Sequence, residues 1–277
     1  MSDSKKKSSS RTSKRDESII DNDSSWADTF RASLGELWSC FLIGLLAAGS
    51  NVWTRQFTGH SLDPLSYGAT FGLLYIVTGI ASHGLAWFIS PSILGAHWWT
   101  TPSSEYSWQL FWQYVVIGVF QLGGWFLAAT AFWGITGGDI DNAAALSNVD
   151  NFWVIFFIEL VGQTLLCQVY LSATSALDSS IKYIAVGLAQ TVLVGVFFNV
   201  TGGSFNFWRS LAFQVVLNRY DTNALVACGV AGCIAPFLAV AWYGWIFTER
   251  ARRSNSGGYG KNNNNNSSTG SESFTSN

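Results

Sequence analysis

The sequence is poor in charged residues. Asp, Glu, Lys and Arg make up 12% of its 277 residues, about half of the roughly 25% that is usual in a soluble domain. The charges also gather at the ends, because residues 1–31 hold 13 of them, residues 249–277 hold 6, and residues 32–248 hold the other 13. Such a middle segment could not cover a water-facing surface, and its many Trp and Phe residues exclude a disordered chain. Residues 32–250 are therefore predicted to lie in a bilayer.

Several kinds of site are also excluded. The cysteines lie in apolar segments without metal-type spacing, and His83 and His97 stand alone, so we expect buried thiols, no metal site and no cofactor. The basic residues near the N-terminus lead into acidic ones rather than into an apolar run, so no secretory signal is expected. Residues 1–31 and 251–277 are polar and of low complexity, which predicts two disordered tails. Their basic residues are mixed with acids, so no nucleic-acid partner is expected. The four cysteines are Cys40, Cys167, Cys228 and Cys233.

Charge-free runs predict membrane-spanning helices, because about 20 apolar residues are needed to cross a bilayer. Residues 64–104 are too long for one crossing. They are predicted to hold a span over about 65–85 and a short segment that dips into the membrane and returns. Residues 183–218 repeat this pattern, with a span that ends at about residue 199. The prediction is an all-α membrane protein with six transmembrane helices and two re-entrant half-helices. The charge-free runs are 37–54, 64–104, 106–138, 160–177, 183–208 and 222–248.

The two halves of this segment follow the same order. Residues 34–134 and 152–247 each run span, span, half-span, span, and three full spans per repeat invert the second repeat relative to the first. Inverted repeats with half-helices at the midplane are typical of channels and transporters, and they disfavour an enzyme. Twelve Lys and Arg residues lie on the side of both termini, against Arg55 and Arg219 on the other side. This bias predicts cytoplasmic termini.

Three charged side chains fall within apolar segments. Glu36 and Glu159 occupy matching places in the two repeats, where an unpartnered carboxylate costs at least roughly 2.5 kcal/mol. They are either an ion or proton relay or buried acceptors for backbone N–H groups of the adjoining half-span, and their symmetry favours the second role. Arg209 is the only basic residue of its apolar stretch. We expect it to line a pore, and a structural or snorkelling role is the alternative.

Two positions are predicted to start the half-helices. Ser90-Pro91 and Asn206 fit this role, because Ser and Asn are good N-caps and Pro is favoured at the first helical position. Capping alone would explain them. A half-helix N-terminus also carries roughly half a positive charge, so two that face each other would repel cations and protons at the midplane.

Residues 201–211, TGGSFNFWRSL, resemble the second signature loop of the aquaporin (major intrinsic protein) family, whose usual form is TGGSFNPARSF. The resemblance extends over about residues 33–250. It places Asn206-Phe207-Trp208 on the second Asn-Pro-Ala triplet of the family. Trp208 thus replaces a small alanine, and its ring is expected to shift the half-helices or narrow the pore.

The first signature is more divergent. Ser90-Pro91-Ser92 fits the first Asn-Pro-Ala triplet and keeps the proline. A rival placement uses Gly95-Ala96-His97 as the family's Gly-Ala-His, which would put Trp99-Thr100-Thr101 on the triplet and lose the proline. We prefer Ser90-Pro91-Ser92.

The resemblance also implies an outer selectivity ring. Carried over by position, it consists of Phe71 (or Thr70, with a shift of one residue), Val194, Gly203 and Arg209. Water-selective members usually have histidine where this sequence has Val194, so the ring here would be wider and more apolar. This favours small uncharged solutes such as glycerol, urea, ammonia or peroxide, in addition to water or in its place.

Two functions follow as alternatives. The first is a passive channel for water or small uncharged solutes, in which Arg209 and the half-helix dipoles exclude ions, and Asn206 and Ser90 bind the permeant. The second is a poorly conducting protein of the same fold with an interaction or regulatory role, and a coupled transporter is a third reading. The resemblance implies a homotetramer without enzymatic activity, and we expect it in the plasma membrane.

Overall fold

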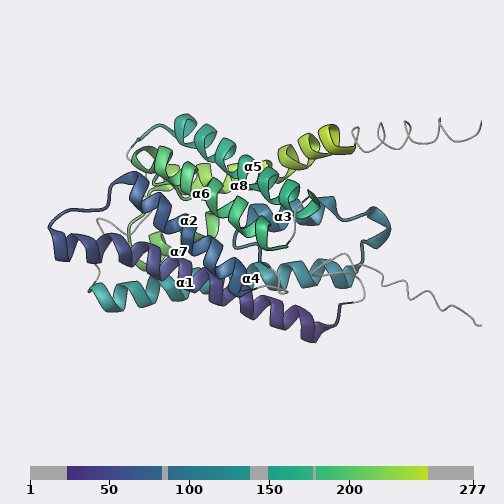
Figure 1. The fold of residues 1–277 in the computed structure, drawn as a ribbon, viewed down its shortest axis with the longest axis horizontal. Helices are drawn as coiled ribbons and strands as arrows, with labels where there is room; N and C mark the ends of the chain where they lie inside the picture. The colour runs from purple at the N-terminus through teal and green to yellow at the C-terminus, as the bar shows by residue number, and fades with distance from the viewer. Residues whose placement is uncertain (1–23, 83–86, 138–148, 177–178, 249–277) are drawn as a thin grey trace, which may run out of the picture.

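The structure, a computed structural model, describes residues 24–82, 87–137, 149–176 and 179–248, so most of both predicted tails and His83 lie outside it. Within these residues every element of secondary structure is helical. In chain order the helices are α1 (Trp26–Thr58), α2 (Pro64–Ala81), α3 (Pro91–Thr100), α4 (Trp108–Thr136), α5 (Phe152–Ala176), α6 (Ser179–Thr201), α7 (Phe207–Val216) and α8 (Thr222–Tyr243) (Figure 1). A 3₁₀ turn, Ser103–Glu105, precedes α4, and a π-helical turn, Gly244–Thr248, extends α8.

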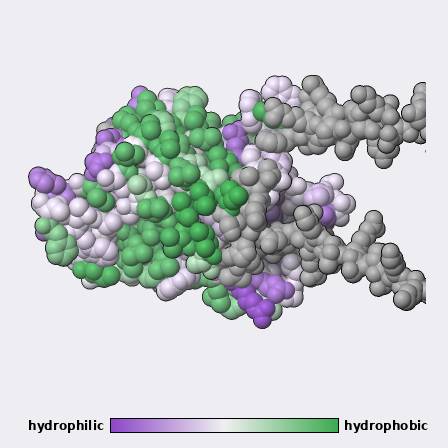
Figure 2. All heavy atoms as spheres, in the orientation of Figure 1, coloured by the Kyte–Doolittle hydropathy of each residue, from purple (hydrophilic) through white to green (hydrophobic). Residues whose placement is uncertain are grey.

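Six of these helices are long and apolar enough to cross a membrane, namely α1, α2, α4, α5, α6 and α8. The face in Figure 2 is a broad apolar band with polar residues gathered toward its ends. Several exposed tryptophans lie near helix ends, as is usual at the boundary between lipid and water; these include Trp26, Trp108, Trp153 and Trp242. The protein is therefore an integral, multi-pass membrane protein, as the charge-free runs predict.

The helices α3 and α7 are too short to cross. Each has 10 residues, or about 15 Å at 1.5 Å per residue, which is half of the roughly 30 Å hydrocarbon core. They follow α2 and α6, where the sequence predicts half-helices. The prediction of six spans and two half-helices is thus confirmed.

The helices pair in the same way in both halves. Leu37 lies beside Gly124 and Gly44 beside Ala128, so α1 and α4 pack in parallel. The helices α5 and α8 do the same, whereas α2 and α6 pack antiparallel. Each half-helix packs on the last span of the other half, α3 on α8 and α7 on α4. Because the matching helices α2 and α6 run in opposite directions, the two repeats are inverted.

Glycines bring α2 and α6 into backbone contact. A Cβ atom on Gly68 would lie 2.6 Å from the Thr191 carbonyl oxygen and 2.8 Å from the Gly195 amide nitrogen. One turn further along α2, a Cβ on Gly72 would overlap the Thr191 hydroxyl and the Gly187 carbonyl. Small residues let membrane helices approach this closely. We call Gly68 and Gly72 of α2, together with Gly187, Thr191 and Gly195 of α6, the glycine seam. It is not among the features that the sequence predicts.

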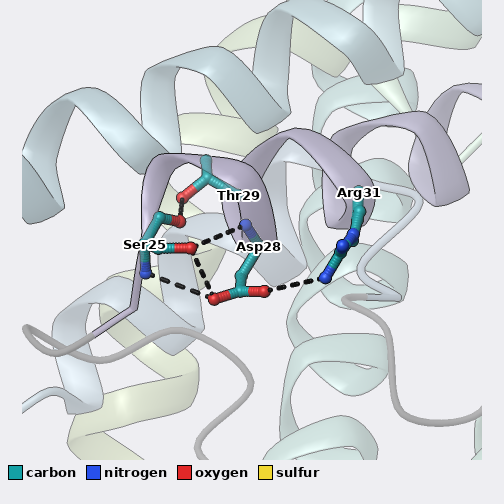
Figure 3. Close-up of polar contacts among 4 residues, drawn as sticks. All are labelled: Ser25, Asp28, Thr29 and Arg31. Carbon is teal, nitrogen blue, oxygen red and sulfur yellow. Dashed lines mark hydrogen bonds and ion pairs between the residues drawn. The ribbon is translucent and has the colours of Figure 1, made fainter.

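The start of α1 corrects one prediction. The helix begins at Trp26, so residues 26–31 are helical although they fall in the segment predicted to be disordered. The Ser25 hydroxyl accepts the N–H of Asp28 at 3.2 Å and donates to the Asp28 carboxylate at 2.7 Å (Figure 3). Arg31 lies 3.4 Å from the same carboxylate. This capping box satisfies N–H groups that a helix start leaves open, so the helix extends beyond its apolar part.

Other helix starts follow the same chemistry. Asp63 precedes Pro64 at the start of α2, and its carboxylate accepts the N–H groups of Leu65 and Ser66, both at 3.0 Å. Hydrogen bonds from the hydroxyl and the N–H of Ser66 lower the pKa of Asp63. Asp221 caps α8 by accepting the N–H of Ala224 at 2.9 Å. These caps fall at charged or polar residues between the apolar runs, where the sequence places the loops.

The glycine seam predicts a position-specific loss of stability. We expect Gly68→Val to lower the free energy of unfolding by about 1–3 kcal/mol, because the new side chain would meet backbone atoms of α6 and cannot be accommodated without a shift of α2. Thermal unfolding of the purified protein in detergent would measure this loss. Gly134→Val is the matched control, since a Cβ there meets nothing within 4 Å. Equal melting temperatures for the two variants would contradict a tight α2–α6 contact.

Candidate functional site

The two half-helices begin at the predicted residues. Ser90 caps α3, with its hydroxyl oxygen 3.3 Å from the N–H of Ser92 and Pro91 at the first helical position. Asn206 caps α7, and its side-chain Oδ1 accepts the N–H groups of Trp208 at 3.1 Å and Arg209 at 3.4 Å. The rival placement of the first signature fails here, because residues 99–101 lie at the other end of α3.

The two starts meet inside the bundle. The Asn206 side-chain amide donates to the Ile89 carbonyl at 2.8 Å, which joins residues from opposite halves of the chain. The same carbonyl lies 3.4 Å from the indole N–H of Trp125. Ile89 and Phe205, the residues before the two caps, both have positive φ angles, 61° and 44°. Non-glycine residues rarely adopt this conformation, which costs of order 1–3 kcal/mol, so the surrounding contacts must hold both turns.

Glu36 holds the first of these turns. Its carboxylate is fully buried and accepts the backbone N–H groups of Phe88 and Ile89, the latter at 2.8 Å. The Gln121 side-chain amide adds a third donor at 3.1 Å. This is the arrangement of a buried acceptor for the adjoining half-span. Three hydrogen-bond donors stabilise the buried carboxylate.

Glu159 is buried in the matching place but has different partners. It accepts from the Gln163 amide and the Cys228 thiol, both at 3.3 Å. These partners are side chains of α5 and α8 rather than backbone N–H groups of the second loop. The symmetric role expected for the two acids is therefore found at Glu36 and replaced by a side-chain network at Glu159.

The difference arises from an exchange of two residue types between helices. One turn after Glu36, α1 carries Cys40, and the glutamine comes from α4 as Gln121. One turn after Glu159, α5 carries Gln163, and the cysteine comes from α8 as Cys228. Each acid thus has one glutamine and one cysteine beside it, but on swapped helices.

The exchanged residues also contact the start of α3. The Cys40 thiol lies 3.7 Å from the Ile89 carbonyl, and Gln163 accepts the Ser92 hydroxyl at 2.5 Å. Three of the cysteines are buried, and Cys233 is exposed. Among the residues that the structure describes, no group of His, Cys, Asp and Glu has the arrangement of a metal site.

Arg209 lies one turn into α7 and is almost fully buried, at 2% exposed. Its Nη2 donates to the Tyr67 hydroxyl at 3.0 Å, and its guanidinium carbon lies 4.7 Å from the centre of the Phe71 ring. Its Nη1 has no hydrogen-bond partner within the described part of the chain. A desolvated guanidinium with an open donor is suited to bind a small acceptor.

Solved structures that resemble this arrangement include the X-ray structure of the aquaglyceroporin from Plasmodium falciparum. The two sequences are 18% identical, the alignment covers 81% of this chain and 99% of that chain, and the TM-score is 0.68. This protein has an aquaporin-like fold. No protein-family model and no curated protein matches the sequence. The likeness therefore establishes the architecture, which includes the six spans and the two half-helices.

The aquaporin-like fold brings the predicted ring residues together as two pairs. Phe71 packs on Arg209, and both are buried. A Cβ on Gly203, whose φ angle is 60°, would lie 3.2 Å from the Cα atom of Val194. The alternative residue Thr70 is more exposed, and its hydroxyl donates to a backbone carbonyl of its own helix.

Two tyrosines that were not among the predicted site residues lie on the same face of α2 as Phe71. Tyr67, Phe71 and Tyr75 follow one another at intervals of four residues, with ring centres 6.1 Å and 5.5 Å apart. We call these three residues the α2 aromatic stripe. Trp87 and Tyr183 continue it at 6.0 Å and 4.9 Å, and none of the five is more than 2% exposed. The four-residue spacing was the signal in the sequence.

Trp208 lies beside Phe207 at the start of α7. It is only partly buried, and its ring lies 5.2 Å from that of Phe207. Phe207 in turn packs against Gly229 of α8. The rings of the α2 aromatic stripe are more deeply buried than Trp208, which is on the side of α7 that remains partly exposed.

The contacts of Glu36 predict a large effect of an isosteric change. We expect Glu36→Gln to lower the free energy of unfolding by at least about 2 kcal/mol, because an amide would set a donor against the N–H of Phe88 or Ile89. Thermal unfolding in detergent is the measurement, and the exposed Glu105→Gln is the control. If the two variants melt at the same temperature, Glu36 does not hold the first loop.

Proposed function

We propose that this protein is a passive channel for water and small uncharged solutes. The observation that carries the proposal is the meeting of the two half-helix N-termini at Asn206 and Ile89, with buried Arg209 one turn away. Each N-terminus carries roughly half a positive charge. Together with Arg209 they create a positive potential at the centre of the bundle, which opposes cations and admits neutral molecules.

The proposed selectivity ring consists of Phe71, Val194, Gly203 and Arg209. Val194 and Gly203 contribute little bulk and no side-chain hydrogen bond, so the ring suits solutes larger and less polar than water alone. Glycerol, urea, ammonia and peroxide are the proposed permeants besides water. The name of the similar structure, an aquaglyceroporin, supports glycerol among them.

The two loops supply the hydrogen bonds of the proposed pore. Ser90-Pro91-Ser92 and Asn206-Phe207-Trp208 are the half-helix starts, in which Asn206 and Ser90 would bind the permeant. Glu36 and Glu159 act as structural acids, because the hydrogen bonds of each carboxylate join it to the first loop or to side chains of neighbouring helices. This argues against a coupled transporter.

The proposal extends to the whole protein. Residues 32–250 form the channel domain, with repeats 34–134 and 152–247, and both termini are cytoplasmic on the basis of the Lys and Arg bias. The protein would act in the plasma membrane as a homotetramer, with one pore in each subunit and no enzymatic activity.

A second function is supported by a specific observation. The α2 aromatic stripe fills the space beside Arg209 and leaves none of its rings more than 2% exposed. A pore that stays in this state conducts poorly. The alternative is therefore an aquaporin-fold protein with an interaction or regulatory role.

The channel proposal predicts transport by purified protein in liposomes. Stopped-flow light scattering is expected to show permeability to water and glycerol above that of empty vesicles, and no proton leak, because the positive centre opposes cations. The proposal is wrong if the permeability to water, glycerol, urea and ammonia equals that of empty vesicles in every variant tested. These variants are the wild-type protein, Trp208→Ala and proteins that lack the α2 aromatic stripe.

The selectivity ring predicts a change of preference. We expect Val194→His to lower the ratio of glycerol to water permeability about tenfold, or roughly 1.4 kcal/mol of barrier, because the imidazole fills space beside Gly203. Val192→His is the matched control, since Val192 is on the same helix but is 60% exposed. An unchanged ratio in Val194→His would place the constriction elsewhere.

A further inference from the structure

The α2 aromatic stripe contacts the buried cation of the proposed pore and the loop that leads to α3. The Tyr67 hydroxyl accepts from Arg209 Nη2 at 3.0 Å. The ring centre of Phe71 lies 4.7 Å from the guanidinium carbon. One turn further along α2, the ring centre of Tyr75 lies 6.0 Å from that of Trp87, which precedes the start of α3. One face of a single helix thus covers Arg209 and packs on the first loop.

The same side chains enclose Arg209, which has almost no solvent-exposed surface. Tyr67 packs from α2 against Phe198 of α6, with ring centres 4.7 Å apart. Arg209 is 2% exposed, and its Nη1 is buried without a partner among the described residues. A buried donor that lacks an acceptor is costly, so ordinary core packing would not select this arrangement. A small molecule with a hydrogen-bond acceptor would satisfy it.

We propose that the α2 aromatic stripe is the gate of the pore, an inference that rests on the proposed channel function. The Tyr67 hydroxyl occupies a position at which the oxygen of water or of a small polyol would bind Arg209. A solute passes when it displaces this hydroxyl and the rings of the stripe turn aside. The gate therefore favours solutes that bind well to the guanidinium.

The packing of α2 determines how this gate opens. Gly68 and Gly72 hold the backbone of α2 against Thr191 and its neighbours on α6. Both glycines adjoin stripe residues in the sequence, so the helix cannot move away from α6 without breaking the glycine seam. Opening therefore takes place by rotation of side chains on a fixed helix.

Removal of the stripe is expected to open the pore. Tyr67→Ala is expected to raise water and glycerol permeability in liposomes at least about tenfold, because it removes a ring and a hydrogen bond to a charged group. Tyr67→Phe removes only the hydroxyl and should give a smaller increase. The double variant Tyr67→Ala/Tyr75→Ala should be the most permeable. Leu73→Ala is the control, since Leu73 is on the same helix but is 59% exposed.

Thiol labelling measures water access independently of transport. Val194→Cys, in a Cys233→Ser background, places a buried thiol beside Gly203. N-ethylmaleimide is expected to label this thiol slowly when the stripe is intact. Labelling should be at least about tenfold faster with Tyr67→Ala, because the variant loses the Tyr67 ring and its hydrogen bond to Arg209. Leu73→Ala should leave the labelling rate unchanged.

The outcomes separate the gate from the channel. Faster transport and faster labelling in the tyrosine variants, but not in Leu73→Ala, support the gate. If the wild-type protein is permeable and the tyrosine variants are equally permeable, the gate is wrong and the channel function remains. If the wild-type protein and the double variant are both as impermeable as empty vesicles, the gate and the channel proposal fail together.

Discussion

The structure depends on one constraint, which is that backbone groups inside a bilayer must find hydrogen bonds within the protein. The non-helical residues just before α3 and α7, 87–90 and 202–206, lie at the centre of the bundle. Their backbone N–H and C=O groups are buried. Glu36 accepts two N–H groups of the first loop, and Asn206 donates to the Ile89 carbonyl across the repeats. These contacts hold Ile89 in a strained conformation and place two half-helix N-termini against each other. The position of Arg209, and with it the proposed function, follows from that junction.

The two repeats reach the same architecture with different chemistry. Glu36 and Glu159 are both buried, but the first binds the backbone of a loop, and the second binds Gln163 and Cys228. A glutamine and a cysteine have exchanged helices between the repeats. Internal symmetry therefore fixes where a buried acid lies, while its partners depend on which neighbouring helix supplies the donor.

The glycine seam and the α2 aromatic stripe are two faces of one helix with opposite roles. The seam keeps α2 at a fixed distance from α6, since any side chain there would meet backbone. The stripe lies on an adjoining face of α2, and its Tyr67 hydroxyl accepts a hydrogen bond from Arg209. The rigid face positions the rings, and in the proposed gate the rings change rotamer without displacement of the helix.

The sequence by itself determined the membrane class, the six spans, the two half-helices and their first residues, because these follow from charge-free length and from capping at Ser90 and Asn206, which are local properties. Arg209 was also identified, since a lone cation in an apolar run is visible without a fold. Only the tertiary structure decided that Tyr67 binds Arg209, that Phe71 rather than Thr70 packs on it, and that Gln163 replaces a backbone donor at Glu159. These contacts join residues from different helices, and their partners depend on rotation and register between helices, which a single sequence does not encode locally.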